Sequence, residues 1–240
     1  MNFIFIMFAS MFGGFIQTIT GFGSGIVIML FLPYIFSVMK ASALNNMITI
    51  ILNFILVKRF YKYIDLKKVI MPVVISFITN TLAVYIGSNL ELNTMKMIFS
   101  VFLIILALYF IFFSDNIKLK DNFLTMFTCS ALAGITNGFF GIGGPPMALY
   151  YLTITNSKEE YIGTTQLYFF LNSIYTTSIR ILSGIITIDL VAYWLPGVFA
   201  VLVGEYLGIK IINKISHKRM KQLMYYFLAI SGILTLLQCL

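Results

Sequence analysis

The sequence predicts an all-α polytopic membrane protein built from two related halves of opposite orientation. Three observations favour this fold class. Of the 240 residues, 60% are hydrophobic and only 10% are charged, whereas soluble domains are about half apolar and about a quarter charged. Long apolar runs alternate with short basic clusters, and glycine-rich breaks recur at a constant spacing. A chain with so few charges cannot cover such an apolar interior as a soluble domain.

Composition also argues against several classes of function. Cys129 and Cys239 both lie in apolar stretches, which supports neither a disulfide framework nor a thiolate metal site. His217, the single histidine, lies in a basic loop, so no histidine serves metal or triad chemistry within an apolar segment. We therefore expect no metal, no cofactor and no enzymatic activity. The first residues lack a basic region, so the N-terminal segment is expected to remain as a membrane element.

Apolar runs of about twenty residues predict helical spans. They are expected at roughly 43–57, 69–87, 95–113, 164–183, 191–212 and 221–240. Two further regions, 3–36 and 124–156, are each too long for one span and are broken by glycine in the middle. The breaks are Gly21-Phe22-Gly23-Ser24-Gly25 and Gly141-Ile142-Gly143-Gly144-Pro145-Pro146. Each region therefore predicts a helical hairpin or a discontinuous helix.

The two halves of the chain repeat. Four residues near the first break have counterparts exactly 120 positions later, near the second break. Gly14, Gln17, Gly21 and Gly23 correspond to Gly134, Asn137, Gly141 and Gly143. With small gaps the correspondence continues through Asp65 and Asp189 and through Pro72 and Pro196. We therefore expect a first repeat at 1–113, a linker at 114–123 and a second repeat at 124–240. Each repeat holds one broken hairpin and three transmembrane helices.

Charge predicts that the repeats are inverted. The loop at 58–68 is rich in Lys and Arg, while its counterpart at 184–190 has none; at 88–96 and 213–221 the order is reversed. Basic loops favour the cytoplasmic side, so equivalent loops lie on opposite sides of the membrane. Both chain termini are then external, and the linker is cytoplasmic. The basic loops are expected to contact anionic headgroups, with no nucleic-acid partner.

Inverted repeats with broken helices are typical of secondary transporters. Where a helix resumes, its first N–H groups and its dipole favour an anion. The helices are expected to resume near Ser24 and Gly144, and Pro145 and Pro146 suit a first helical turn. Two such N-termini would bind an anion without Lys or Arg. The alternative is that these glycines only permit close helix packing.

The same motifs indicate a family. The chain resembles the TauE/SafE family of bacterial membrane transporters in the two glycine breaks, in Pro33 downstream of the first, and in Gly163-Thr164-Thr165 at the start of the next span. The resemblance covers essentially the whole chain. It implies a multi-pass protein of the bacterial cytoplasmic membrane whose substrate is sulfite, a sulfonate or a related small organic anion.

Polar side chains inside the spans are the candidate ligands, because polar groups in hydrocarbon are costly and tend to serve function. The predicted substrate-binding residues are Gln17, Gly21, Gly23, Ser24, Gly25, Asn46, Asn137, Gly141, Gly143, Gly144, Thr164 and Gln166. Asn53 and Asn172 fit this site and an interhelical hydrogen bond equally well.

Two charged residues lie within predicted spans. Arg180, near the outer end of its span, is expected to snorkel to the interface, or alternatively to attract anions into an outer vestibule. Glu205 lies deeper in its span with no basic residue one turn away on the same helix. It is therefore a candidate for proton coupling, the alternative being a neutral carboxyl bonded to Tyr206 or to a backbone carbonyl.

Together these features predict a carrier that moves a small anion by alternating access, with lipid and a coupling proton or other ion as its other partners. Two alternatives remain open at the level of sequence. One is a passive anion channel with the same architecture, and the other is a membrane scaffold subunit without transport activity.

Overall fold

The computed structural model describes residues 2–112 and 119–211, and every regular element in these ranges is helical. The α-helices are α1 (Asn2–Thr20), α2 (Ser24–Phe31), α3 (Val38–Phe60), α4 (Lys67–Ser88), α5 (Leu92–Phe112), α6 (Phe123–Phe140), α7 (Gly144–Ile154), α8 (Lys158–Leu182) and α9 (Ile188–Ile211). Two short 3₁₀ helices, η1 (Leu32–Tyr34) and η2 (Tyr61–Tyr63), follow α2 and α3. The all-α prediction is confirmed for this part of the chain.

Both predicted helix breaks are present. The first separates α1 from α2, and Gly21 and Gly23 have φ values of 82° and 108°. The second separates α6 from α7, with Gly141 at φ 68°. Side chains with a Cβ rarely adopt this left-handed region, so glycine permits both sharp reversals. The helices resume at Ser24 and Gly144, as the sequence predicts.

Five of the described helices are long and apolar enough to cross a membrane, as judged by length and composition. These spans are Asn2–Thr20, Val38–Tyr63, Lys67–Ser88, Phe123–Phe140 and Ile188–Ile211. The predicted spans 43–57, 69–87, 95–113, 164–183 and 191–212 fall on α3, α4, α5, α8 and α9 respectively. The predicted span 221–240, the basic loop at 213–221 and most of the linker at 114–123 lie outside the described residues.

The largest difference from the predicted boundaries is at the start of α8. This helix begins at Lys158, six residues before the predicted span at 164. The Ser157 side chain caps it by accepting a hydrogen bond from the Glu160 N–H at 3.1 Å, and the acidic side chains of the first turn suit a helix N-terminus. Hydropathy does not detect this turn because it is charged.

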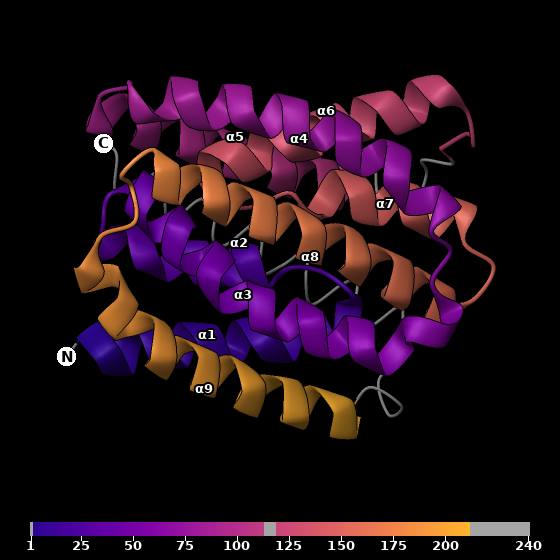
Figure 1. The fold of residues 1–240 in the computed structure, drawn as a ribbon, viewed down its shortest axis with the longest axis horizontal. Helices are drawn as coiled ribbons and strands as arrows, with labels where there is room; N and C mark the ends of the chain where they lie inside the picture. Colours follow the sequence, from indigo (N-terminus) through magenta and orange to yellow (C-terminus); the bar gives the residue numbers. More distant parts are fainter. Residues whose placement is uncertain (1, 113–118, 212–240) are drawn as a thin grey trace.

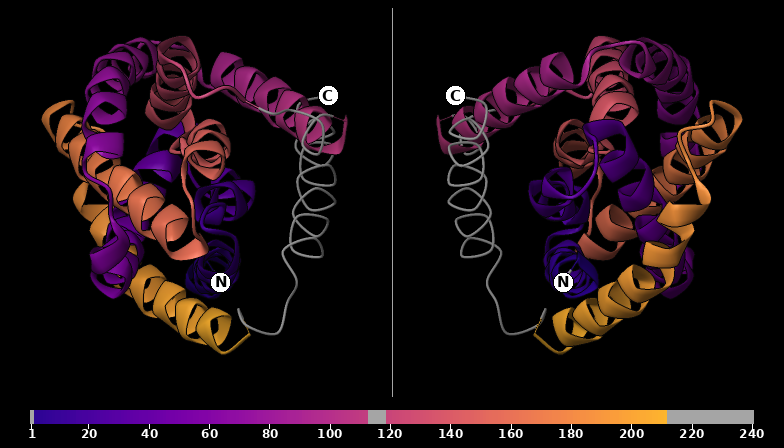
Figure 2. Two further views of the ribbon diagram at one scale, coloured as in Figure 1. Left: turned by 90° about the vertical axis from the view of Figure 1, so that its right-hand side faces the viewer. Right: turned by 90° about the vertical axis from the view of Figure 1, so that its left-hand side faces the viewer.

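The long helices pack in pairs. Helix α1 lies along α9, α4 along α6, and α3 along α8. In Figures 1 and 2 the α1–α9 and α4–α6 pairs lie at opposite sides of the bundle, with α3 and α8 between them. The short helices α2 and α7 each pack against the helix before and the helix after them. This arrangement places both breaks inside the bundle.

Glycine allows the outer pairs to approach closely. A Cβ at Gly204 of α9 would lie 1.9 Å from the Met11 carbonyl oxygen of α1. A Cβ at Gly134 of α6 would lie 2.0 Å from Thr79 Oγ1 and 2.6 Å from the Ser76 carbonyl oxygen of α4. Small residues at such crossings are typical of membrane helices, whose association depends on close van der Waals packing.

The surface of α4 shows what the bundle presents to its surroundings. Its outward-facing positions are large and apolar, and the exposed side chains are Ile70, Met71, Val74, Ile78, Leu82, Tyr85 and Ile86. An apolar face of this extent suits contact with lipid rather than with water.

Candidate functional site

The two helix breaks meet inside the bundle. A Cβ at Gly25, in the first turn of α2, would lie 2.9 Å from the carbonyl oxygen of Gly141. Asn45 of α3 fixes this contact, because its Nδ2 donates a hydrogen bond to the same oxygen at 2.9 Å. The first turn of α2 is therefore held against the break between α6 and α7.

A pocket lies at this junction and opens to one side. The empty space in the pocket and its opening together is about 480 Å³. Its walls come from both breaks and from α1, α3, α6 and α8. The lining residues are Gln17, Gly23, Ser24, Gly25, Ile26, Asn46, Thr49, Asn53, Ala133, Asn137, Gly141, Ile142, Gly143, Gly144, Pro145, Tyr168, Phe169, Asn172 and Ser173. Nine of these are among the predicted site residues, and none of the residues that line the pocket carries a charged side chain.

Gln17 organises the polar wall of the pocket. Its Nε2 donates to Asn53 Oδ1 at 2.6 Å and to Gln166 Oε1 at 2.9 Å. Its Oε1 accepts a hydrogen bond from Ser24 Oγ, at the start of α2. One amide thus joins α1, α2, α3 and α8, and every partner is buried. Because such a network is satisfied only in one geometry, it orients the side chains around the pocket.

The pocket also holds a donor without a protein partner. Asn46 is 1% exposed, and its Nδ2 has no hydrogen-bond partner within the described structure. The first N–H groups of an α-helix have no intrahelical acceptor, and α2 and α7 both begin at this wall. Buried polar atoms are costly when unpaired, and the Asn172 Oδ1 acceptor at the same wall is unpaired too. This pocket therefore suits a polar ligand that accepts hydrogen bonds.

Three predicted site residues lie outside the pocket wall. Gly21 and Gln166 bond to each other, the Gln166 Nε2 donating to the Gly21 carbonyl oxygen at 2.6 Å, and they support the wall from behind. Thr164 lies elsewhere, at the N-terminal part of α8, where its Oγ1 accepts a hydrogen bond from the Asp65 N–H at 3.3 Å.

The snorkelling interpretation of Arg180 is wrong. Its side chain is completely buried, and its Nη2 donates to the carbonyl oxygens of Asn137 and Gly138 at 3.2 and 2.8 Å. These carbonyls belong to the last turn of α6, whose dipole favours a cation. The partners come from a distant segment of sequence, so the hydropathy of the Arg180 span gave no indication of them.

Glu205 also lies away from the pocket. It is 8% exposed on α9, among the residues that pack near α1. Tyr206 is 57% exposed, and no hydrogen bond joins it to Glu205 in the described structure.

Sequence reasoning did not predict eight of the residues that line the pocket: Ile26, Thr49, Ala133, Ile142, Pro145, Tyr168, Phe169 and Ser173. Ser173 could have been found from the repeat, since it lies 120 positions after Asn53, and Asn53 Nδ2 donates to its Oγ at 3.4 Å. Asn53 and Asn172 both line the pocket and both make hydrogen bonds to protein atoms, so they combine the two roles left open by the sequence.

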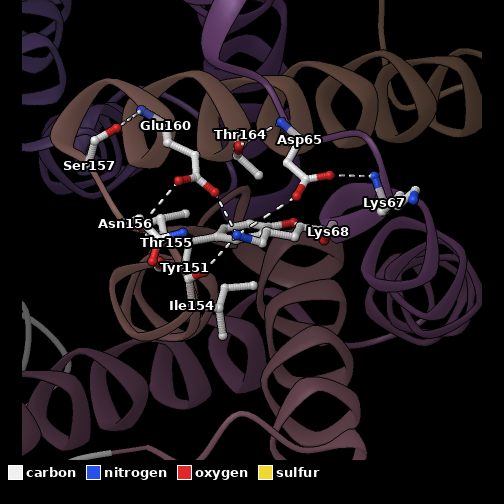
Figure 3. Close-up of polar contacts among 10 residues, drawn as sticks. All are labelled: Asp65, Lys67, Lys68, Tyr151, Ile154, Thr155, Asn156, Ser157, Glu160 and Thr164. Carbon is white, nitrogen blue, oxygen red and sulfur yellow. Dashed lines mark hydrogen bonds and ion pairs between the residues drawn. The ribbon is translucent and has the colours of Figure 1, made fainter.

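A polar cluster lies at the other end of α8, around Lys68 (Figure 3). The Lys68 Nζ lies 2.6 Å from Glu160 Oε1 and donates to the Ile154 carbonyl oxygen at 2.7 Å. It also lies 3.8 Å from Asp65 Oδ2. Lys68 therefore joins the start of α4 to the end of α7 and the start of α8. The hydrogen bond from Lys68 holds the pKa of Glu160 below its ordinary value of 4.5, with help from the Asn156 N–H.

We expect this cluster to make stability pH-dependent. A carboxyl whose pKa is lowered by folding stabilises the protein above its ordinary pKa and loses that contribution as pH falls through the native value. E160Q should lower the melting temperature at neutral pH, by about 1 kcal/mol or less in stability, and the difference from the unmodified protein should vanish in acid. Thermal unfolding in detergent at several pH values measures this.

The matched control is E159Q, which removes the neighbouring exposed carboxylate. This variant loses only the interaction of Glu159 with the helix N-terminus, so at neutral pH its melting temperature should fall less than that of E160Q. If E160Q and E159Q behave alike at neutral pH, Lys68 and Glu160 do not stabilise the junction of α4, α7 and α8.

Metal binding has no support in the described residues, among which no three His, Cys, Asp or Glu side chains are grouped to hold an ion.

The comparison that decides the family is the match of the family described as "Sulfite exporter TauE/SafE" to residues 6–235, nearly the whole chain. The chain belongs to the TauE/SafE family. Comparisons with curated proteins and with solved structures gave no match. As a TauE/SafE chain with several apolar helices, it is a transmembrane protein of a transporter family.

Proposed function

We propose that this TauE/SafE protein is a secondary transporter that moves a small anion across the bacterial cytoplasmic membrane. The anion would be sulfite, a sulfonate or a related organic anion, and it would bind in the pocket between the two helix breaks. The observation that carries the proposal is this pocket, which combines two helix N-termini with the free buried donor of Asn46.

The chemistry of the pocket favours an anion over a cation. The N-terminus of α2 presents N–H donors and partial positive charge to a ligand. Helix α7 adds its dipole but has no N–H at Pro145 or Pro146, and Asn46 adds a side-chain donor. No carboxylate lies among the lining residues to bind a cation. Amide and backbone donors release their ligand more readily than a direct ion pair, which suits a site that must bind and discharge its substrate.

Packing supports the proposed inverted repeats, 1–113 and 124–240. When each helix is replaced by its counterpart in the other half, the α1–α9 pair becomes α6–α4, and the α3–α9 pair becomes α8–α4. All four contacts are present, and α3–α8 is related to itself. A two-fold relation between the halves would produce this exchange of partners. Such a relation underlies alternating access in transporters with broken helices, and the charge pattern favours external termini.

Counterflow in proteoliposomes tests the proposal. Labelled sulfite is placed outside vesicles that contain unlabelled sulfite, a small sulfonate, a carboxylate or chloride. Transient accumulation of label driven by one internal anion is the expected result, because a carrier exchanges bound substrate. A flux that neither saturates nor shows counterflow would indicate a channel. Folded protein without any flux would overturn the transport proposal and favour a scaffold.

We further propose Glu205 as the proton-coupling group. It is a mostly buried carboxyl on α9, which packs along the helix that carries Gln17 and the first break. E205Q should retain counterflow, which needs no net proton movement, but lose the response of net uptake to a pH gradient. D189N, which removes the exposed carboxyl at the start of the same helix, is the control and should keep that response. A full gradient response in E205Q would exclude Glu205 from coupling.

A further inference from the structure

One face of α8 carries polar side chains at three successive turns. Asn172, Thr176 and Arg180 follow one another at intervals of four residues, and all three are buried. At the helical rise they extend over about 12 Å along the axis. Asn172 lines the pocket, so this polar row, which we call the α8 track, begins at the proposed substrate site.

Thr176 connects the first part of the α8 track to the neighbouring helices. Its Oγ1 accepts hydrogen bonds from Asn80 Nδ2 of α4 at 2.7 Å and from Asn137 Nδ2 of α6 at 2.8 Å, and donates to the Asn172 carbonyl oxygen at 2.7 Å. Asn137 also lines the pocket. The track is therefore a continuous polar seam between α4, α6 and α8.

Arg180 ends the track with an incompletely bonded cation. Only its Nη2 donates hydrogen bonds, whereas Nε and Nη1 have no partner within the described structure. No carboxylate of the described residues forms an ion pair with it. The ends of α6 and α8 offset part of its charge. A buried guanidinium with open donors is nevertheless costly, so it fits an anion that is bound for part of a transport cycle.

Counted at a strict spacing of 120 residues, the face of α3 that corresponds to this row is apolar. The positions that precede Asn172, Thr176 and Arg180 by 120 residues are Leu52, Leu56 and Phe60. Leu52 and Leu56 are buried in the hydrophobic core, so this helix face packs well without polar groups.

We propose that Arg180 forms a second anion-binding position, through which the substrate passes between the pocket and the membrane face where α8 ends. The inference rests on the proposed function and adds the residue that selects negative charge. The open Nε and Nη1 donors bind the oxyanion when α6 and α8 move apart, and Asn137 and Thr176 lie on the way to the pocket.

The test compares R180Q, R180K and the unmodified protein in sulfite counterflow. R180Q removes the charge, and its half-saturating sulfite concentration should rise at least about tenfold, the value for one lost charge-assisted hydrogen bond. R180K keeps the charge but lacks the planar fork, so its half-saturating concentration should rise about threefold, between the other two. K210Q removes an exposed cation from α9 and should change neither value.

Each outcome is decisive. If Arg180 only clamps the end of α6, R180Q lowers the yield or the maximal rate while half-saturation stays unchanged, and the inference is overturned. If R180Q does not fold, the test uses R180K alone. An R180K protein with the same half-saturating sulfite concentration as the unmodified protein also overturns the inference. Folded unmodified protein without counterflow would instead overturn the proposed function itself, which separates the two failures.

Discussion

N46D is expected to abolish anion counterflow in protein that still folds. Aspartate has the shape of asparagine but cannot donate the hydrogen bond that the free Asn46 Nδ2 offers to the pocket. Above neutral pH it also places a negative charge next to the bound anion. At about 4 Å and an effective dielectric constant of about 20, this repulsion is about 4 kcal/mol, which corresponds to roughly a thousandfold loss of affinity.

The measurement is sulfite counterflow at pH 8 with size-exclusion chromatography as the test of folding. N89D makes the same change at an exposed residue after the end of α4 and should transport normally. A folded N46D protein that saturates at the same sulfite concentration as the unmodified protein would show that Asn46 is not a ligand. The proposed position of the site would then be wrong.

G204A is expected to have the largest effect on stability. The added Cβ would lie 1.9 Å from the Met11 carbonyl oxygen and 2.8 Å from the Met11 carbonyl carbon and the Phe15 nitrogen. All three are backbone atoms, so the clash is relieved only if α1 separates from α9. Overpacking of this kind costs about 3 kcal/mol or more. We expect most of the protein to be lost from the monodisperse fraction in detergent.

G184A is the matched control because Gly184 has open space around it. Its φ of 68° still makes alanine unfavourable, by about 1 kcal/mol, so G184A should melt slightly early and remain monodisperse. A G204A protein that melts with the unmodified protein would mean that α1 and α9 do not pack as described.

The helix breaks could be predicted from sequence because their cause is local. Glycine at Gly21, Gly23 and Gly141 permits the reversed backbone, and the prolines after Gly144 lack the N–H groups that a first turn leaves unpaired. Many of the residues that line the pocket could also be predicted, because the sequence repeat identifies which amide side chains of the two halves correspond. The rotation of a helix about its axis is not given by that correspondence. Gln166 therefore lies behind the wall, whereas Asn46, its counterpart, lines it.

Arg180 could not be placed from sequence for a related reason. Its partners are backbone carbonyls of α6, which any sequence would offer, and only the packing of α6 against α8 brings them within reach. Thr164 likewise bonds to a backbone N–H, that of Asp65, which no side-chain pattern records. Tertiary contacts to the main chain are thus the part of the site that pattern reasoning could not supply.

The ion pair between Lys68 of the first half and Glu160 of the second has no counterpart, since the position related to Lys68 through Asp65 and Asp189 is Ala192. If the halves are related by the proposed two-fold axis, the ion pair stabilises one end of the bundle and has no equivalent at the other. In a carrier this difference biases the equilibrium between the inward-facing and outward-facing states of the empty protein. The favoured state is the one in which the end with the Lys68–Glu160 ion pair stays closed. The fraction of carriers whose binding site is open to sulfite would then differ between the two sides of the membrane. Half-saturation should differ between import and export, although the equilibrium distribution of substrate is the same for both directions.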